Sequence, residues 1–358
     1  MNFGPKDLHA VIRKLVSRTN LSQDEITQTI SLILQGEASE AYIASFLVAL
    51  SMKGESTDEI RIILQTVKKH AIRITPRVNG CLIDNCGTGG DIINSFNIST
   101  ASAIIASSAG TKIAKHGNRS VSGLCGSADF MEYIGIDLNC PVQDILAAIE
   151  HAGIGFLYAP KFHPAMRNVV SARRTIGIRT IFNILGPLSN PCTNLGGQLI
   201  GVSEPKLLET MALVMQNSDI QEVMLVHGYD GFDELSNTCE NIITWIIGKE
   251  IKNIRLHPRD VNIELTKSEN LIIRSKEDSV RDTLQVIYGV ASKEKQDIAV
   301  LNASAALVVG KVAVDLREGV DIAREVIKDG SAQKKLLELI QRCGKKEILR
   351  TAEKKFLT

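Results

Sequence analysis

The sequence lacks several features that mark whole classes of protein. Its formal net charge is only +1, so it has no excess of positive charge with which to attract nucleic acid or an anionic membrane surface. No stretch approaches the roughly 18 consecutive apolar residues of a membrane-spanning helix. The N-terminal residues contain no apolar core of the signal-peptide type. We therefore expect a cytoplasmic protein whose anion-binding sites are local, built from loops and helix ends.

Paired cysteines are also missing. The chain has seven cysteines, an odd number, and none of them forms a Cys-x-x-Cys pair. This pattern argues against a disulfide framework and against a thiolate zinc site, and it favours a reducing compartment. With 358 residues, 44% of them hydrophobic and 23% charged, the chain has the composition of a globular enzyme with two domains, or with one large and one small domain.

The first part of the chain has a helical pattern. Apolar residues recur at spacings of three and four between positions 6 and 70. Ser22 and Glu25 form a capping box that predicts a helix start, and Gly36 and Gly54 are typical of helix ends. We expect a small all-helical domain over residues 1–72. The basic segment 164–180 is also predicted to be helical, and we expect helices from about 165–190 to join this small domain.

From residue 73 to 358 the pattern alternates between short apolar runs, polar loops and helices, which predicts an α/β domain with a mainly parallel central sheet. A meander of short strands is predicted over 244–258. The C-terminal third is predicted to form helices at 281–289, 294–313, 317–328 and near 333–342. The predicted strands cover residues 81–86, 111–117, 153–159, 180–185, 198–202 and 222–228.

A glycine-rich loop, Gly87-Thr88-Gly89-Gly90-Asp91, directly follows the first predicted strand. Glycines allow the backbone to approach a ligand closely, and their amide groups can converge on an anion. Asn97 or Ser99 then begins a helix as a candidate N-cap, and a helix N-terminus favours phosphate. The loop matches neither the P-loop nor the dinucleotide pattern. A tight turn alone would explain the glycines, but their combination with Asp91 and the helix start favours phosphate or pyrophosphate binding.

A second loop, from Lys115 to Gly123, lies at the end of another predicted strand. Lys115 can neutralise phosphate charge, and Ser120 and Ser122 can donate hydrogen bonds to phosphate oxygens. A solvated basic turn is the simpler interpretation, but ligands in open α/β sheets bind at this edge, which favours a phosphate site. His116 is more simply a packing residue than a general base.

Two further features could carry chemistry. Asp233 and Glu234 follow the strand predicted at 222–228, and such a pair suits Mg²⁺, which takes one or two carboxylates together with substrate phosphates. A solvated acidic turn is the alternative, and the two phosphate loops make the metal site the favoured one. In the basic helix, Arg173 or Arg174 could clamp a carboxylate, although most helix arginines face solvent.

These segments together resemble the anthranilate phosphoribosyltransferase family, in order and over most of the chain. The stretches that carry the resemblance are CGTGGD at 86–91, SFNISTASA at 95–103, AKHGNRSVSG at 114–123, GSAD at 126–129, HPAMRNVVSARRTIGIRTIFNILGPLSNP at 163–191 and DGFDELS at 230–236. The resemblance implies a small α-helical domain and a larger α/β domain with the active site in the cleft between them. It also implies a homodimer that forms through the small domain, and a reaction between phosphoribosyl pyrophosphate (PRPP) and anthranilate in tryptophan synthesis.

The resemblance also implies roles for individual residues. Metal ligands are implied at Ser99, Asp233 and Glu234, with Mg²⁺ as the cofactor. Anthranilate contacts are implied at Gly87, Asn118 and Arg173, with Arg173 facing the carboxylate. Lys115 is implied as an electrostatic catalyst, and no residue is assigned as a general base. The implied PRPP contacts are Gly87, Gly90, Asp91, Ser95, Asn97, Ile98, Ser99, Thr100, Lys115, His116, Gly117, Asn118, Arg119, Ser120, Val121, Ser122, Gly123 and Ser127.

The sequence departs from the family pattern in a few places. Ile92, Ile93 and Asn94 replace the usual small residues, Ser95 replaces a threonine, and Leu124-Cys125 stand where Lys-Ser is common. Two alternative functions stay open. A pyrimidine-nucleoside phosphorylase would share the fold but does not need the acidic pair. A non-catalytic relative that binds nucleic acid would require a basic surface, which a net charge of +1 does not favour.

Overall fold

The chain forms two compact units, and each is described by itself. The computed structural model describes residues 5–90, 93–120 and 123–357. One unit consists of residues 1–73 and 160–191, and the other of residues 74–159 and 192–358. Three predicted site residues, Asp91, Val121 and Ser122, lie outside the described residues, as does Ile92.

The first unit is helical. Its helices are α1 (Pro5–Val16), α2 (Gln23–Gln35), α3 (Glu40–Lys53), α4 (Thr57–Lys69), α8 (Ala159–Phe162, which begins one residue before the unit), the 3-10 turn η2 (Pro164–Met166), α9 (Arg167–Ile176) and α10 (Ile181–Leu188). Helix α9 packs against α2 and α3, and the Asn168 side chain donates to the Leu34 carbonyl at 2.8 Å. The core of this unit contains Ile26, Ile30 and Phe46, all fully buried.

The predicted helix boundaries in this unit have clear local causes. The capping box at Ser22 is confirmed: the Ser22 hydroxyl accepts from the Glu25 amide and the Glu25 carboxylate accepts from the Ser22 amide. Gly36 ends α2 with a φ of 79°, a left-handed conformation that glycine adopts at little cost. Gly54 directly follows the last residue of α3, so the predicted end of that helix is confirmed as well.

A seven-stranded sheet forms the centre of the second unit, in the order β3-β2-β1-β4-β5-β6-β7. The first five strands in that order are parallel, and β5, β6 and β7 pair antiparallel. The prediction of a mainly parallel sheet is therefore confirmed. The strands are β1 (Leu82–Gly87), β2 (Lys112–Gly117), β3 (Ile154–Tyr158), β4 (Gly197–Gly201), β5 (Glu222–Gly228), β6 (Asn241–Ile247) and β7 (Glu250–Leu256).

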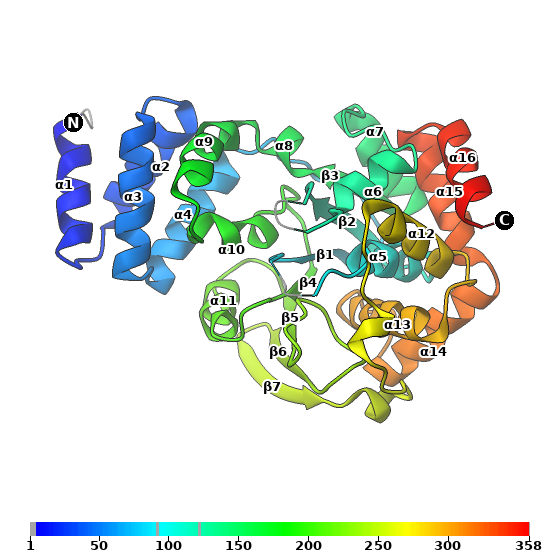
Figure 1. Ribbon diagram of the computed structural model, residues 1–358. Coiled ribbons are helices and arrows are strands. Elements are labelled where there is room, and N and C mark those ends of the chain that lie inside the picture. The colour runs from blue at the N-terminus through cyan, green and yellow to red at the C-terminus, as the bar shows by residue number, and fades with distance from the viewer. Residues whose placement is uncertain (1–4, 91–92, 121–122, 358) are drawn as a thin grey trace. The chain divides into compact units, whose positions relative to one another are not determined.

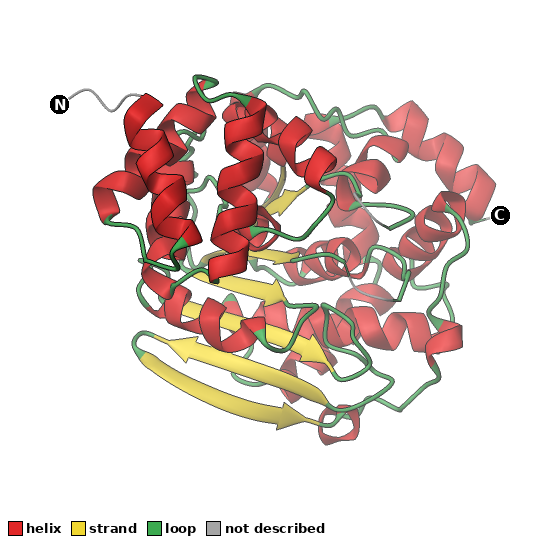
Figure 2. Ribbon diagram, turned by 60° about the vertical axis from the view of Figure 1, so that its left-hand side comes forward, coloured by secondary structure: helices red, strands yellow, loops and turns green. Residues whose placement is uncertain are grey.

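Helices cover this sheet, which explains why its parallel strands are almost continuously buried. Helices α5 (Ile98–Ser108) and α13 (Lys293–Val309) pack against the sheet and against each other, and α11 (Leu207–Gln216) packs against β5, β6 and β7. Figure 1 shows α11 and α13 on opposite sides of β5, and the β6–β7 hairpin is the outermost pair of strands in Figure 2. The remaining helices are α6 (Ser127–Tyr133), α7 (Val142–Ala147), the π-helix η1 (Ala148–Ala152), the 3-10 turns η3 (Pro258–Val261) and η4 (Ser268–Asn270), α12 (Lys276–Ile287), α14 (Leu316–Lys328), α15 (Ser331–Cys343) and α16 (Lys346–Phe356).

One predicted strand is wrong. The sequence predicts a strand over 180–185, but Ile181–Leu188 is helix α10 in the helical unit. A short apolar run suits a buried helix as well as a buried strand, so the hydrophobic pattern does not distinguish them. The local signal is at Thr180, whose amide donates to the Asn183 side chain at 3.0 Å and so begins the helix. None of the helices that the structure describes is both long and apolar enough to cross a membrane.

Candidate active site

The sheet contains a point at which its strand order reverses. Strands β1 and β4 are neighbours, but the chain continues from β1 towards β2 and β3, and from β4 towards β5 on the other side. Ligands in open α/β sheets bind outside the carboxyl ends of the strands at such a point. The loops after β1 and β4 meet there: the Thr88 amide donates to the Gly201 carbonyl at 2.9 Å, and the Ser203 amide donates to the Thr88 hydroxyl at 3.1 Å.

The acidic turn after β5 lies against the glycine loop after β1. The Asp233 carboxylate accepts a hydrogen bond from the Gly89 amide at 2.7 Å, although the two residues are 144 positions apart. A Cβ atom on Gly87 would lie only 2.3 Å from the same carboxylate oxygen. On Gly201, a Cβ would lie 1.5 Å from the Asp233 carbonyl oxygen. Glycine is required at both positions because the acidic turn occupies the space of a side chain.

Helix α5 brings further predicted residues towards the same loops. The buried Lys115 ammonium donates to the Asn85 carbonyl at 2.8 Å and to the Ser99 hydroxyl at 3.2 Å. Ser99 stands in the first turn of α5, where free amide groups favour an anion. Lys115 therefore places a positive charge beside a hydroxyl at a helix N-terminus.

The environment of Lys115 acts on its charge in two opposing ways. Its side chain is almost completely buried, and burial lowers its pKa because the charged form loses its water. The nearby Asp84, Cys86 and Glu234 oppose this effect, and the pKa of Lys115 is lowered on balance. Glu234, the second residue of the acidic pair, is thus one of the charged groups that act on the pKa of this lysine.

The sequence predicts Asn97 as an N-cap through its side chain, and this expectation needs correction. Asn97 does occupy the N-cap position of α5, but its side chain makes no capping hydrogen bond. The amide instead donates to the Ser279 hydroxyl at 2.9 Å and to the Cys125 sulfur at 3.4 Å. Its partners come from α12 and from the loop before α6, so the capping bond is replaced by tertiary contacts.

The second predicted loop is held by a carboxylate on α6. Asp129 accepts from the Ser120 amide at 3.1 Å and from the Gly126 amide at 3.0 Å. The Arg119 guanidinium pairs with Asp129 and with Glu132. The side chain of Arg119 is therefore engaged in ion pairs with two carboxylates of α6.

One buried acid near the site was not singled out from the sequence. Asp84, in the middle of β1, is fully buried. It accepts from the His116 amide at 2.9 Å and from the Gln198 side chain at 3.3 Å. These bonds join three neighbouring strands. The available signal was a carboxylate within a short strand predicted to be buried, where an unpartnered charge would be costly.

Within the helical unit, the structure distinguishes Arg173 from its neighbours. Arg173 is half-buried, whereas Arg167, Arg174 and Arg179 are exposed. Its guanidinium lies 5.8 Å from the centre of the Phe182 ring, and burial lowers the pKa of Arg173. A preorganised, partly dehydrated guanidinium of this kind suits a planar carboxylate.

The donor set of the α/β unit fits a magnesium ion bound together with a phosphate ligand. Asp233 and Glu234 offer two carboxylates, and Ser99 offers a hydroxyl. The described part of the chain contains no group of three or more His, Cys, Asp or Glu residues that could hold a metal ion. Mg²⁺ commonly takes only one or two protein carboxylates and completes its shell with water and phosphate oxygens. The missing third carboxylate is thus expected for an ion that a diphosphate helps to bind.

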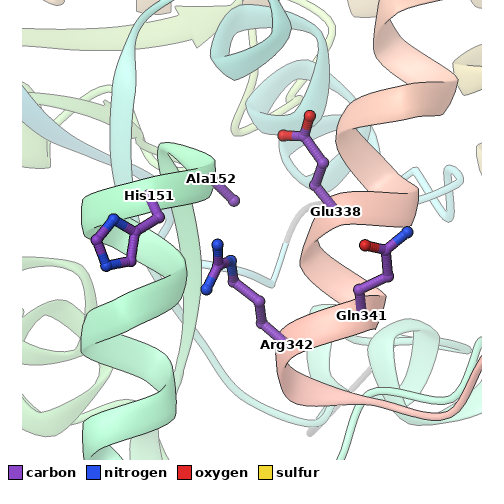
Figure 3. Close-up of a pocket in the computed structure, with 5 residues that line it drawn as sticks. All are labelled: His151, Ala152, Glu338, Gln341 and Arg342. Carbon is purple, nitrogen blue, oxygen red and sulfur yellow. The ribbon is translucent and has the colours of Figure 1, made fainter.

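A surface pocket elsewhere in the α/β unit has a different character. It measures about 430 Å³ and lies between η1 and α15, with His151, Ala152, Glu338, Gln341 and Arg342 as its lining (Figure 3). Lys335 donates to the Ala152 carbonyl at 2.6 Å and to Glu338 at 2.7 Å, which ties the two helices together. None of its lining residues belongs to the two loops or the acidic turn, so it plays no part in the candidate site.

Comparison with known proteins agrees with this geometry. Residues 79–333 match the family model for the α/β domain of a glycosyl transferase family, and residues 9–71 match the model for its helical bundle domain. The anthranilate phosphoribosyltransferase of Acetivibrio thermocellus is 42% identical over 334 residues, 93% of this chain and 96% of the relative. The chain belongs to the anthranilate phosphoribosyltransferase family. It is therefore an enzyme of the glycosyl transferase class, and the family resemblance found in the sequence is confirmed.

Solved structures of the family have the same fold. The anthranilate phosphoribosyltransferase of Thermus thermophilus superposes with a TM-score of 0.85 at 34% identity, covering 95% of this chain and 99% of that one. The Saccharomyces cerevisiae enzyme, solved in complex with PRPP and Mg, gives a TM-score of 0.86 at 24% identity and covers 96% of this chain and 99% of that one. The predicted fold class, a small helical domain with a larger α/β domain, is confirmed.

Proposed function

We infer that this chain transfers the 5-phosphoribosyl group from PRPP to anthranilate, giving N-(5-phosphoribosyl)anthranilate and pyrophosphate in tryptophan biosynthesis. The observation that most supports this inference is the contact between the acidic pair and the glycine loop. At the reversal point of the sheet, the Asp233 carboxylate lies 2.7 Å from the Gly89 amide. The glycine loop, which suits phosphate, and the acidic pair, which suits a metal, are thus in direct contact.

We propose that Asp233, Glu234 and Ser99 hold Mg²⁺ together with the diphosphate of PRPP. When bound, the metal neutralises the negative charge that builds up on the departing diphosphate. The hydrogen bond from the Gly89 amide holds the Asp233 carboxylate beside the glycine loop, where the metal and the diphosphate would bind together. Two carboxylates suffice because the substrate supplies the remaining charge.

The proposed PRPP contacts are the first and second loops and the start of α5, as the family resemblance implies. Backbone amides of the glycine loop and the N-terminus of α5 donate to phosphate oxygens. Lys115, whose ammonium lies 3.2 Å from the Ser99 hydroxyl, adds a fixed positive charge. Anthranilate is assigned to Gly87 and Asn118, with Arg173 binding its carboxylate.

The proposed reaction needs little proton chemistry from the protein. The anthranilate nitrogen forms a bond to the anomeric carbon while the bond from that carbon to the diphosphate oxygen breaks, and the electron pair leaves with pyrophosphate. An aromatic amine is neutral near pH 7, so its nitrogen lone pair is available without a strong base, and the extra proton of the product passes to water. The chain acts by orienting the two substrates and by stabilising the charge of the leaving group.

The fluorescence of anthranilate provides a direct test. We expect the signal to fall only when PRPP and Mg²⁺ are both present, and to remain constant when either is omitted. Phosphorolysis of thymidine or uridine by the same preparation, without consumption of anthranilate, would instead favour a pyrimidine-nucleoside phosphorylase. The acidic pair at 233–234 argues against that alternative because phosphorolysis needs no such metal site.

We further propose that the chain is a cytoplasmic homodimer that associates through its helical unit. All seven cysteines are free thiols, which suits a reducing compartment. On the helical unit, Val16 and Met52 are 71% and 74% exposed and stand at the ends of α1 and α3, two helices that pack together. The helical unit and the α/β unit are proposed to be separate domains, the smaller one assembled from two segments of the chain.

A further inference from the structure

Two buried asparagine side chains bind the backbone directly after the acidic pair. The first is Asn302, which lies in α13 and is fully buried. Its side-chain oxygen accepts from the Leu235 amide at 2.9 Å, and its side-chain nitrogen donates to the Leu235 carbonyl at 2.8 Å. One amide group thus pairs with both polar groups of a single residue, as a neighbouring strand would.

The second asparagine makes the same arrangement on the next residue. Asn241, the first residue of β6, is also fully buried. Its oxygen accepts from the Ser236 amide at 2.6 Å, and its nitrogen donates to the Ser236 carbonyl at 2.8 Å. Two consecutive residues of the turn are therefore held by side chains that come from different secondary-structure elements.

Asparagine is a costly choice at position 302. It favours a helix less than alanine does, and the buried side of α13 around it consists largely of Ile, Val, Leu and Ala. A buried amide left without partners would cost about 1–3 kcal/mol for each unsatisfied group. Apart from its bonds to Leu235, the Asn302 side chain donates to the Ile298 carbonyl of its own helix at 2.9 Å. Alanine would stabilise the helix more, so the asparagine at position 302 is explained by its hydrogen bonds to the turn.

We propose that Asn302 and Asn241 are positioning residues for the reaction, which hold the acidic turn so that Asp233 and Glu234 meet the metal and the diphosphate. This inference rests on the proposed role of the two carboxylates as metal ligands. Glu234 directly precedes Leu235, so a shift of the Leu235 backbone moves the carboxylate with it. Metal sites tolerate displacements of only about 0.5 Å from the productive geometry.

The contacts of Asp233 with the loops after β1 and β4 also support this role. The Asp233 carbonyl faces Gly201, where even a methyl group would not fit, and the Asp233 carboxylate is bound by the Gly89 amide. The turn is therefore held by close contacts with Gly87 of β1 and Gly201 of β4, and by hydrogen bonds to the Gly89 amide and to the two asparagines of α13 and β6. Closing a loop would not by itself require contacts from this many elements.

The test compares Asn302→Ala and Asn241→Ala with Ser304→Ala. Ser304 is an equally buried residue of α13 whose hydroxyl donates to the Leu301 carbonyl of its own helix. The full-length variants are titrated with Mn²⁺ in the presence of PRPP, and bound metal is followed by electron paramagnetic resonance. Asp233→Asn and Glu234→Gln serve as references for loss of a ligand. Thermal unfolding is measured on each variant to separate loss of stability from loss of metal binding.

We expect the two asparagine variants to bind Mn²⁺ about tenfold more weakly or worse, the usual effect of removing a partner of a metal ligand, while Ser304→Ala binds as the wild type does. If Asp233→Asn loses the metal but Asn302→Ala keeps full affinity, the positioning role is wrong and the ligand assignment stands. If Asp233→Asn and Glu234→Gln both keep full affinity, the ligand assignment fails, and the positioning role fails with it.

A measurement on the wild-type protein covers the case in which the alanine variants do not fold. The amide protons of Leu235 and Ser236 lie in a turn between β5 and β6, yet each is hydrogen-bonded to a buried side chain. We expect them to exchange with solvent as slowly as the amides of the adjoining strand β5. Rapid exchange, typical of a surface loop, would overturn the proposal.

Discussion

At the scale of single residues, Arg173 gives the sharpest prediction about the acceptor. Its guanidinium is half-buried beside Phe182, so a carboxylate bound there gains a charge-assisted hydrogen bond worth about 1.5–3 kcal/mol. We expect Arg173→Ala to raise the KM for anthranilate roughly 10- to 100-fold, with a much smaller change in the KM for PRPP. Steady-state kinetics with each substrate varied in turn measures both values.

The control for this variant is Arg174→Ala. Arg174 is the next residue of the same helix but is exposed, so its loss removes the same charge from the surface without touching the position beside Phe182. We expect wild-type KM values for both substrates. Equal increases in the two KM values of Arg173→Ala would contradict its assignment to the anthranilate carboxylate.

Gly201 gives a second prediction at this scale. In Gly201→Ala the new methyl group overlaps the Asp233 carbonyl, so the acidic turn must move. We expect about 1–3 kcal/mol of destabilisation, as is usual for overpacking, together with a higher Mg²⁺ concentration for half-maximal activity.

The matched control is Gly197→Ala in the same strand, where the methyl group meets Val309 instead. That variant should lose stability but keep the wild-type dependence on Mg²⁺. An identical Mg²⁺ dependence in both variants would refute the link between Gly201 and the metal site.

At the scale of elements, the sequence was sufficient to predict those features that depend on residues close together in the chain. The two loops and the acidic pair could be identified because glycines, donors and carboxylates follow apolar runs, and a parallel sheet brings the ends of its strands to one edge. The error at 180–185 arose where hydrophobicity alone had to distinguish a buried helix from a buried strand. The contacts of Asn97, Asn241 and Asn302 could not be predicted, because their partners lie on elements whose packing only the tertiary structure determines.

The start of helix α4 gives a prediction about stability. Glu59 completes the capping box of Ser56 and is 1% exposed. It also forms a buried ion pair with Lys53 at 2.7 Å and accepts from the Leu21 amide at 3.0 Å. Removing one partner of a buried pair costs about 3–5 kcal/mol. We therefore expect Glu59→Gln to lower the free energy of unfolding by a value in that range, as measured by urea denaturation at pH 7.

The same residue predicts a dependence of stability on pH. Burial raises the pKa of Glu59, but the hydrogen bonds from Leu21, Lys53 and Ser56 outweigh it, and the pKa is lowered from its ordinary value of 4.5. A carboxyl group with a lowered pKa in the folded state stabilises the protein above its unfolded-state pKa, and this contribution is lost as the pH falls through the folded-state pKa. The unfolding free energy of the wild type should therefore fall below about pH 4.5 more steeply than that of Glu59→Gln.

Helix α2 supplies the control for both measurements. Glu25 stands at the same position of a capping box and also pairs with a lysine, Lys14, but that pair is exposed to solvent. Exposed ion pairs contribute at most about 1 kcal/mol, so Glu25→Gln should cost far less than Glu59→Gln. Similar losses in the two variants would contradict the assignment of the effect at Glu59 to its buried ion pair.

At the scale of the whole molecule, the proposed dimer follows from the end of the helical unit where α1 and α3 terminate. The Lys53 ammonium donates to the Asn20 side chain at 2.9 Å, which ties the loop after α1 to the end of α3. Val16 and Met52, from these same two helix ends, are more than two-thirds exposed at 71% and 74%. Burying two such side chains in each subunit would contribute several kcal/mol to association, at about 1.5–3 kcal/mol for each side chain.

We therefore expect the double variant Val16→Glu and Met52→Glu to be a monomer at concentrations at which the wild type is a dimer, as judged by light scattering coupled to size exclusion. Charges placed on a buried apolar surface oppose association, because they must lose their water without gaining a partner. Val314 is 83% exposed but lies in the α/β unit, so Val314→Glu should leave the dimer intact. A wild-type chain that is monomeric throughout, or a double variant that remains a dimer, would rule out this surface as the interface.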